Sequence, residues 1–207
     1  MNRGFWSAVA AVALVVALAP AAAADGDPAS DYLIGQKVFY SFDAGIPASN
    51  AQRLQTMVAN ANRAGFPIRV ALIRRNSDLG AAYQLMGEPQ KYAQFLGQEL
   101  LFVYRKGILI VMPNGFGYAV NGKPVPQAKR ELAGIAAPGN DGARLADAGT
   151  LAVQRLARAS GHDLPLPTTS DNSVTSDRIK IGAIAVTAAV IVAAAMLVRR
   201  SRKAATR

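Results

Sequence analysis

Short apolar runs that alternate with helical stretches restrict this chain to few folds. The runs KVFYSF (37–42), FPIRVALI (66–73) and GILIVM (107–112) have the length and the aromatic or β-branched content of buried strands. Between the first two lies ASNAQRLQTMVANANRAG (48–65), whose apolar residues recur at the spacing of one helical face: Leu54, Met57, Val58 and Ala61. This order predicts parallel strands that are joined by right-handed crossovers.

The remaining elements continue the pattern. EPQKYAQFLGQELLFVY (88–104) predicts a second helix, and PNG (113–115) predicts a turn that leads into a returning strand, FGYAV (116–120). GARLADAGTLAVQRLARASG (142–161) predicts a last helix, and a short helix is expected near 127–134. The order β-α-β-α-β-β-α predicts an α/β fold, a three-layer α/β/α sandwich with a mostly parallel sheet and one β-hairpin.

The first predicted helix carries signals at both ends. Ser49 and Gln52 have the spacing of a capping box at its start. Gly65 follows its last turn, where glycine commonly ends a helix because it adopts a left-handed conformation without strain.

The N-terminus has the composition of a secretory signal peptide. Arg3 precedes an apolar stretch over residues 5–19, Pro20 interrupts it, and small residues lead to Ala24. This pattern predicts a signal peptide over residues 1–24. An uncleaved membrane anchor is the alternative.

The C-terminus predicts a transmembrane helix over residues 179–198. About 18 of these residues in a row carry no charge, and at ~1.5 Å per residue they extend about 27 Å, close to the ~30 Å of a bilayer core. A buried core helix is the competing interpretation, but the run has no polar face. The basic residues of 199–207 indicate a cytoplasmic tail. We therefore expect a single-pass protein of the cell membrane, in contact with the lipid bilayer through 179–198 and with its N-terminal domain extracytoplasmic.

The charge distribution argues against nucleic acid as a partner. The formal net charge is +10, but seven basic residues at the two ends carry most of it, which leaves 16 basic against 13 acidic side chains. A nearly balanced chain lacks the basic stripe that phosphate binding needs. This count covers the whole middle of the chain, in which a Pro-, Ser- and Thr-rich linker (163–178) joins the predicted α/β domain (31–162) to the predicted span.

The chain resembles membrane-anchored bacterial members of the TPM domain family, named after a thylakoid lumen protein, a photosystem accessory protein and a nematode receptor modulator. The resemblance covers about 130 residues and is carried by FDAGIPASNAQRLQTMVANANRAGFPIRVALI (42–73) and KGILIVMPNGFGYAV (106–120). It implies a role in the assembly, repair or modulation of membrane complexes. The turn YRKG departs from the family pattern, because Arg105 and Lys106 stand where family members often have an acidic, metal-associated turn.

Two carboxylates are the candidate metal ligands. Asp43 follows the first predicted strand and Asp78 follows the second, so both are expected at the carboxyl edge of the sheet, where ligands bind in open α/β folds. Together they could hold a hard cation such as Ca²⁺. The alternative is that both side chains cap turns, and the sequence favours it because two carboxylates are few for such a site.

The sequence favours a non-catalytic protein. His162 is the only histidine, there is no cysteine, and the usual nucleophile, zinc and phosphate-loop motifs are missing. No cofactor is predicted. A metal-dependent phosphatase of the kind suggested for TPM relatives is the alternative, and a structural spacer is a third possibility.

The segment 74–89 is the candidate partner-binding region. It carries four apolar or aromatic residues near the expected ligand edge: Leu79, Tyr83, Leu85 and Met86. Exposed, they would form a patch for another membrane or envelope protein. The equally favoured alternative is a short helix that folds back over the sheet. The leading hypothesis is therefore a membrane-tethered, extracytoplasmic domain that binds or modulates membrane-associated proteins.

Overall fold

A computed structural model describes residues 26–41 and 43–168 and shows one sheet in a mixed α/β fold. Five strands lie in chain order, and the first three run parallel. The fourth and fifth each run antiparallel to the strand before, so four of the five strands point the same way. The predicted α/β class and mostly parallel sheet are confirmed. The strands are β1 (Val38–Tyr40), β2 (Ile68–Leu72), β3 (Gly107–Met112), β4 (Gly115–Val120) and β5 (Lys123–Pro124).

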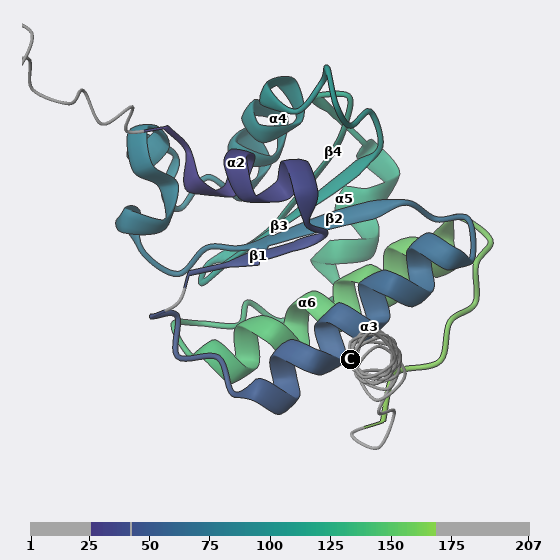
Figure 1. The fold of residues 1–207 in the computed structure, drawn as a ribbon. Helices are drawn as coiled ribbons and strands as arrows, with labels where there is room; N and C mark the ends of the chain where they lie inside the picture. The colour runs from purple at the N-terminus through teal and green to yellow at the C-terminus, as the bar shows by residue number, and fades with distance from the viewer. Residues whose placement is uncertain (1–25, 42, 169–207) are drawn as a thin grey trace, which may run out of the picture.

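Helices cover both faces of this sheet (Figure 1). On one face a first core packs the sheet against α3 (Ala48–Arg63), α5 (Pro126–Ala133) and α6 (Gly142–Ala159). On the other face a second core packs it against α2 (Pro28–Gly35), the 3₁₀ helix η1 (Asn76–Leu85) and α4 (Pro89–Glu99).

Strand β3 explains why both faces need cover. All six of its residues are buried, and alternate side chains point to opposite faces. Leu109 and Val111 join the first core, while Ile108, Ile110 and Met112 join the second. A continuous apolar run is therefore stable only as a central strand with helices on both sides.

The two crossovers between parallel strands have opposite hands. The connection from β1 to β2 runs through α3 on the face of the first core, and that from β2 to β3 runs through α4 on the opposite face. Both steps move the same way across the sheet. Since changing the face reverses the hand, one connection is left-handed, and the prediction of right-handed connections throughout is wrong for that one. Helices α3 and α6 already cover the face of the first core, so α4 packs on the opposite face and covers the other side of the sheet.

Glycine ends the two long helices of the first core. Gly65 has a φ of +91° after α3, and the Phe66 N–H donates to the Ala61 carbonyl over 2.9 Å. Gly161 (φ +86°) ends α6 in the same way. Both ends satisfy carbonyl groups that the helix itself leaves free. The capping box predicted at the start of α3 is wrong, because the helix begins at Ala48 and its N-cap is Pro47.

The folded part extends beyond the predicted domain 31–162 at both ends. Helix α2 starts at Pro28, and its residues Ala29 and Leu33 are fully buried in the second core. Leu164, in the predicted linker, packs against the first core, and its carbonyl accepts a bond from the Gln154 side chain over 2.8 Å. These contacts tie both flanks to the domain.

The predicted signal peptide and the predicted span at 179–198 lie outside the described residues. Within residues 26–41 and 43–168, no helix combines the length and the apolar character that crossing a bilayer requires.

Candidate functional site

The carboxyl edge of the sheet is occupied by the protein's own arginines. Arg74, just after β2, donates through Nη1 to the Ala44 carbonyl over 2.8 Å. Its Nε donates to the carbonyl and to the side-chain oxygen of Asn140, at 3.1 and 3.2 Å. One side chain thus joins the loop before α3 to the loop before α6, across the end of the sheet.

Gly142 shows how closely these two loops approach. A Cβ atom there would lie 2.4 Å from the Gly45 carbonyl oxygen and 2.7 Å from that of Ala44, and no real Cβ makes such contacts with backbone. Only glycine therefore lets α6 begin against the loop that precedes α3. The edge where ligands usually bind in such folds is filled by chain packed on chain.

Asp43 and Asp78 both lie at this edge, and each already has protein partners. Asp78 is 2% exposed, and its Oδ2 accepts the N–H groups of Arg74 and Arg75 at 2.8 and 3.0 Å. Asp43 is exposed, and its carboxylate forms an ion pair with the Arg75 guanidinium. Arg75 therefore contacts both candidate ligands, one through its side chain and one through its backbone, and a cation would compete with it for Asp43.

This geometry favours the interpretation in which Asp78 caps a turn. With its carboxylate it closes the first turn of η1. Across residues 26–41 and 43–168, no group of three or more histidine, aspartate or glutamate side chains is placed to hold a metal ion.

The candidate partner-binding residues separate into buried and exposed members. Leu79 is fully buried in the second core, so the expectation that it lies in a surface patch is wrong. Leu85 and Met86 are half-buried against the same core, whereas Tyr83 is 54% exposed. The segment folds back as η1 against α2 and α4, with Leu79 and Ala82 buried in the second core, and this short helix was the alternative interpretation.

His162 lies at the end of α6, next to Phe66. The two ring centroids are 6.1 Å apart, and the His162 N–H donates to the Ala157 carbonyl as part of the helix end. The residue therefore joins the ends of α3 and α6. None of the candidate carboxylates is among these contacts.

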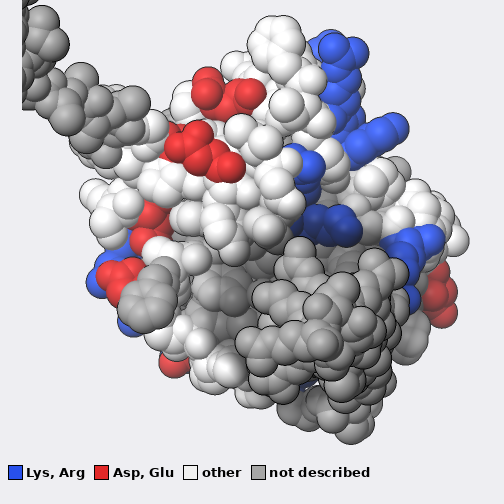
Figure 2. Space-filling model, viewed as in Figure 1, with Lys and Arg blue, Asp and Glu red and all other residues white. Residues whose placement is uncertain are grey.

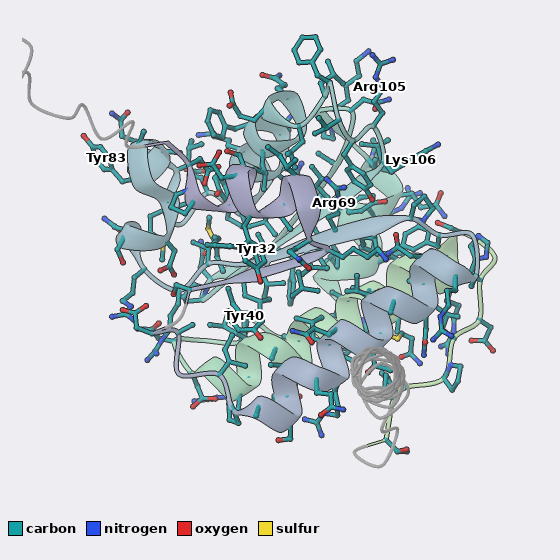
Figure 3. All side chains as sticks on the ribbon, viewed as in Figure 1. Tyr32, Tyr40, Arg69, Tyr83, Arg105 and Lys106 are labelled. Carbon is teal, nitrogen blue, oxygen red and sulfur yellow. The ribbon has the colours of Figure 1, made fainter. Side chains whose placement is uncertain are left out.

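A hollow of about 470 Å³ runs along the free edge of β1, and sequence reasoning did not find it. It lies between α2 and α3 and is lined by Tyr32, Gln36, Lys37, Val38, Gln55 and Ala59. In Figure 3, Tyr32 and Tyr40 lie on either side of β1. The Gln55 amide donates to the Tyr40 hydroxyl over 3.2 Å, which fixes one wall. The only sequence signal is the pair of tyrosines near a short strand.

A second hollow, of about 260 Å³, lies where the start of α4 meets the β3–β4 hairpin and α5. Gln90 and Asn114 supply polar groups, and Leu132 and Ile135 line the opposite wall. The Gln90 side chain is already engaged by the backbone of Tyr118, to which it donates at 3.0 Å and from which it accepts at 3.2 Å. This hollow offers fewer free polar groups than the one beside β1.

One buried carboxyl lies under α2. Asp27 is 6% exposed, and its Oδ1 accepts the Ala29 N–H over 3.0 Å and the Tyr92 hydroxyl over 2.7 Å. Its Oδ2 is buried without a hydrogen-bond partner. Burial raises the pKa of Asp27, and the bond from Tyr92 offsets part of that rise. The group caps α2 and fixes it to α4.

No family model matches this sequence, and the searches of curated proteins and of solved structures likewise find no match. The resemblance to TPM domain proteins therefore stays a prediction from residues 42–73 and 106–120.

Proposed function

We propose that this chain is a membrane-tethered, extracytoplasmic domain that binds or modulates another membrane or envelope protein and does not catalyse a reaction. In this proposal, the three-layer α/β/α domain is followed by a linker and by a transmembrane helix at 179–198. The signal peptide delivers the domain to the outer face, and the basic residues of 199–207 stay in the cytoplasm. The pattern of the sequence at both ends supports this topology.

The observation that carries the binding function is the hollow beside β1. In the part of the chain that the structure describes, β1 is paired with a strand on one side, and its other edge can accept an added strand. An extended segment of a partner can pair with such an edge, while pockets beside it select side chains. Tyr32, which is 51% exposed, lines this hollow and is an aromatic side chain of the kind enriched in protein interfaces.

The phosphatase alternative gains no specific support from the carboxyl edge. Asp78 is bonded to backbone N–H groups, and Asp43 is paired with Arg75. Catalysis at this edge would need these two residues released and further ligands recruited.

Site-specific photo-crosslinking in intact cells tests the proposal. A crosslinker at Gln36, exposed in the hollow beside β1, should give a discrete adduct with a membrane or envelope protein. The same group at Lys91, exposed on α4, which packs mainly on β3 and β4, is the matched control and should not. The adduct should fade when Tyr32 is changed to Asp. Equal labelling from both positions, or a reporter fusion that places residues 26–168 in the cytoplasm, would contradict the proposal.

A further inference from the structure

The turn between α4 and β3 presents apolar side chains directly to water. Phe102 is 91% exposed and Val103 is 57% exposed, the first more than any other large apolar side chain in the described residues. Helix α4 was expected to continue to residue 104, but it ends at Glu99 and leaves these side chains outside both cores. Adjacent exposed apolar side chains can mark a surface that contacts a membrane or another protein.

The turn is held in one conformation by the residues around it. The N–H groups of Val103 and Tyr104 donate to the Leu100 carbonyl at 3.0 and 2.7 Å, and Leu100 is buried. The Arg69 guanidinium stacks on the Tyr104 ring, 3.9 Å from its centroid. The Tyr104 hydroxyl donates to the Gly107 carbonyl over 3.3 Å. Phe102 is therefore displayed by a fixed turn, not by a loose loop.

Two cations adjoin this apolar pair. Arg105 and Lys106 are exposed, and the Arg105 Nε donates to the Leu101 carbonyl over 3.1 Å. Basic atoms gather at the upper right of Figure 2, the region where Figure 3 labels these two residues in the same view. Residues 100–106 contain no acidic side chain. We call Phe102, Val103, Arg105 and Lys106 the α4–β3 tip.

The α4–β3 tip lies at the amino edge of the sheet, where α6 also ends. The Gly107 N–H donates to the Pro67 carbonyl over 3.3 Å, and the neighbouring Phe66 contacts His162 at the end of α6. Ten residues separate Thr168 from residue 179, which at ~3.6 Å each reach roughly 36 Å at most. The chain past α6 turns back along the first core (Figure 1), so this tether holds the domain as a whole beside the bilayer, and the apolar and basic side chains of the tip are what favour its side of the domain for lipid contact.

We propose that the α4–β3 tip inserts into the interfacial layer of an anionic bilayer and sets the orientation of the domain on the membrane. Aromatic and aliphatic side chains enter the boundary between headgroups and acyl chains, and adjacent arginine and lysine side chains bind anionic headgroups. The orientation of the domain rests on the proposed function, because it assumes the tether formed by the linker and the transmembrane helix. Contact between the tip and lipid does not depend on that tether. The hollow beside β1 stays free, because β1 is the lateral edge of the sheet.

Tryptophan fluorescence of the full chain in vesicles tests this inference. Trp6, the one tryptophan of the sequence, is changed to Phe, and a new tryptophan is placed by Phe102→Trp or, as the matched control, by Tyr83→Trp. In vesicles that contain phosphatidylglycerol, the emission at position 102 should shift to the blue. Bromine atoms attached to the acyl chains should quench the tryptophan emission at position 102 at least roughly two-fold more strongly than the emission at position 83. The double variant Arg105→Glu/Lys106→Glu should reduce that quenching to the level of the control.

Quenching at position 102 no greater than at position 83 would overturn the inference, and it is the result expected if the tip binds a protein. Quenching that charge reversal leaves unchanged would overturn the part given to Arg105 and Lys106. An alkaline wash of the same vesicles reports on the predicted span separately. If the wash removes the protein, the proposed tether fails, and the quenching at position 102 still decides whether the tip contacts lipid.

Discussion

Replacing Asp78 distinguishes a structural carboxylate from a metal ligand. Asp78→Ala removes an acceptor that holds the N–H groups of Arg74 and Arg75. Hydrogen bonds to a charged group contribute about 1.5–3 kcal/mol each. Because both donors lie in a partly buried turn that water can reach, the expected loss is about 2–4 kcal/mol. Asp78→Asn keeps one acceptor oxygen and should lose roughly half as much.

Asp43→Ala is the matched control, since it removes the other candidate carboxylate. Its ion pair with Arg75 is exposed, so its loss should cost only about 0–1 kcal/mol. The measurement is urea unfolding of the full chain in mild detergent, followed by circular dichroism, with and without calcium. An Asp78→Ala variant within about 0.5 kcal/mol of the parent chain would refute the capping argument. Calcium that stabilises the parent chain and neither alanine variant would instead support a metal site.

Three further predictions use the same unfolding measurement. Gly142→Ala should cost about 1–3 kcal/mol or more, because the added Cβ meets backbone atoms. Gly149→Ala should cost less, because its Cβ meets only side chains, at 3.3–3.5 Å. Equal losses of stability in the two variants would contradict the contact between the loops before α3 and α6. Burial raises the pKa of Asp27, so the folded state binds the proton more tightly than the unfolded state does. Acidification from neutral pH toward 3.8 should therefore raise the unfolding free energy of the parent chain relative to that of Asp27→Asn. A difference in unfolding free energy between the two chains that does not change with pH would count against this. Leu79→Ala should cost about 2–5 kcal/mol and Tyr83→Ala under about 1 kcal/mol, and similar losses would place Leu79 at the surface.

The central strands and the long helices could be predicted because their residues repeat a single pattern. Strand β3 begins and ends where its apolar run does, and α3 follows its apolar stripe. Helix α2 was missed because it follows the predicted signal peptide and has a weak apolar face, although Asp27 and Pro28 form a typical helix start. Helix α4 was predicted too long because Leu101, Phe102 and Val103 continue its apolar composition outside the core.

The candidate site was predictable in position and not in its contacts. The rule that loops after parallel strands meet at one edge placed Asp43 and Asp78 correctly. The sequence did not reveal their partners: Asp78 accepts from the backbone N–H groups of Arg74 and Arg75, and Asp43 pairs with the Arg75 side chain. The hand of each crossover likewise depends on which face a helix covers, and local pattern carries no information about that choice.

The two outer strands differ in a way that limits self-association. Strand β5 has two residues, and one of them, Pro124, lacks an N–H group, so the sheet cannot be extended from that side. Among the strands of residues 26–41 and 43–168, only β1 can accept another strand. Filaments built by adding sheets edge to edge require two open borders, and this molecule has one. Two copies of the chain that pair their sheets can therefore form only a two-fold dimer, with β1 against β1. Such a dimer would occupy the hollow beside β1 that a partner would use.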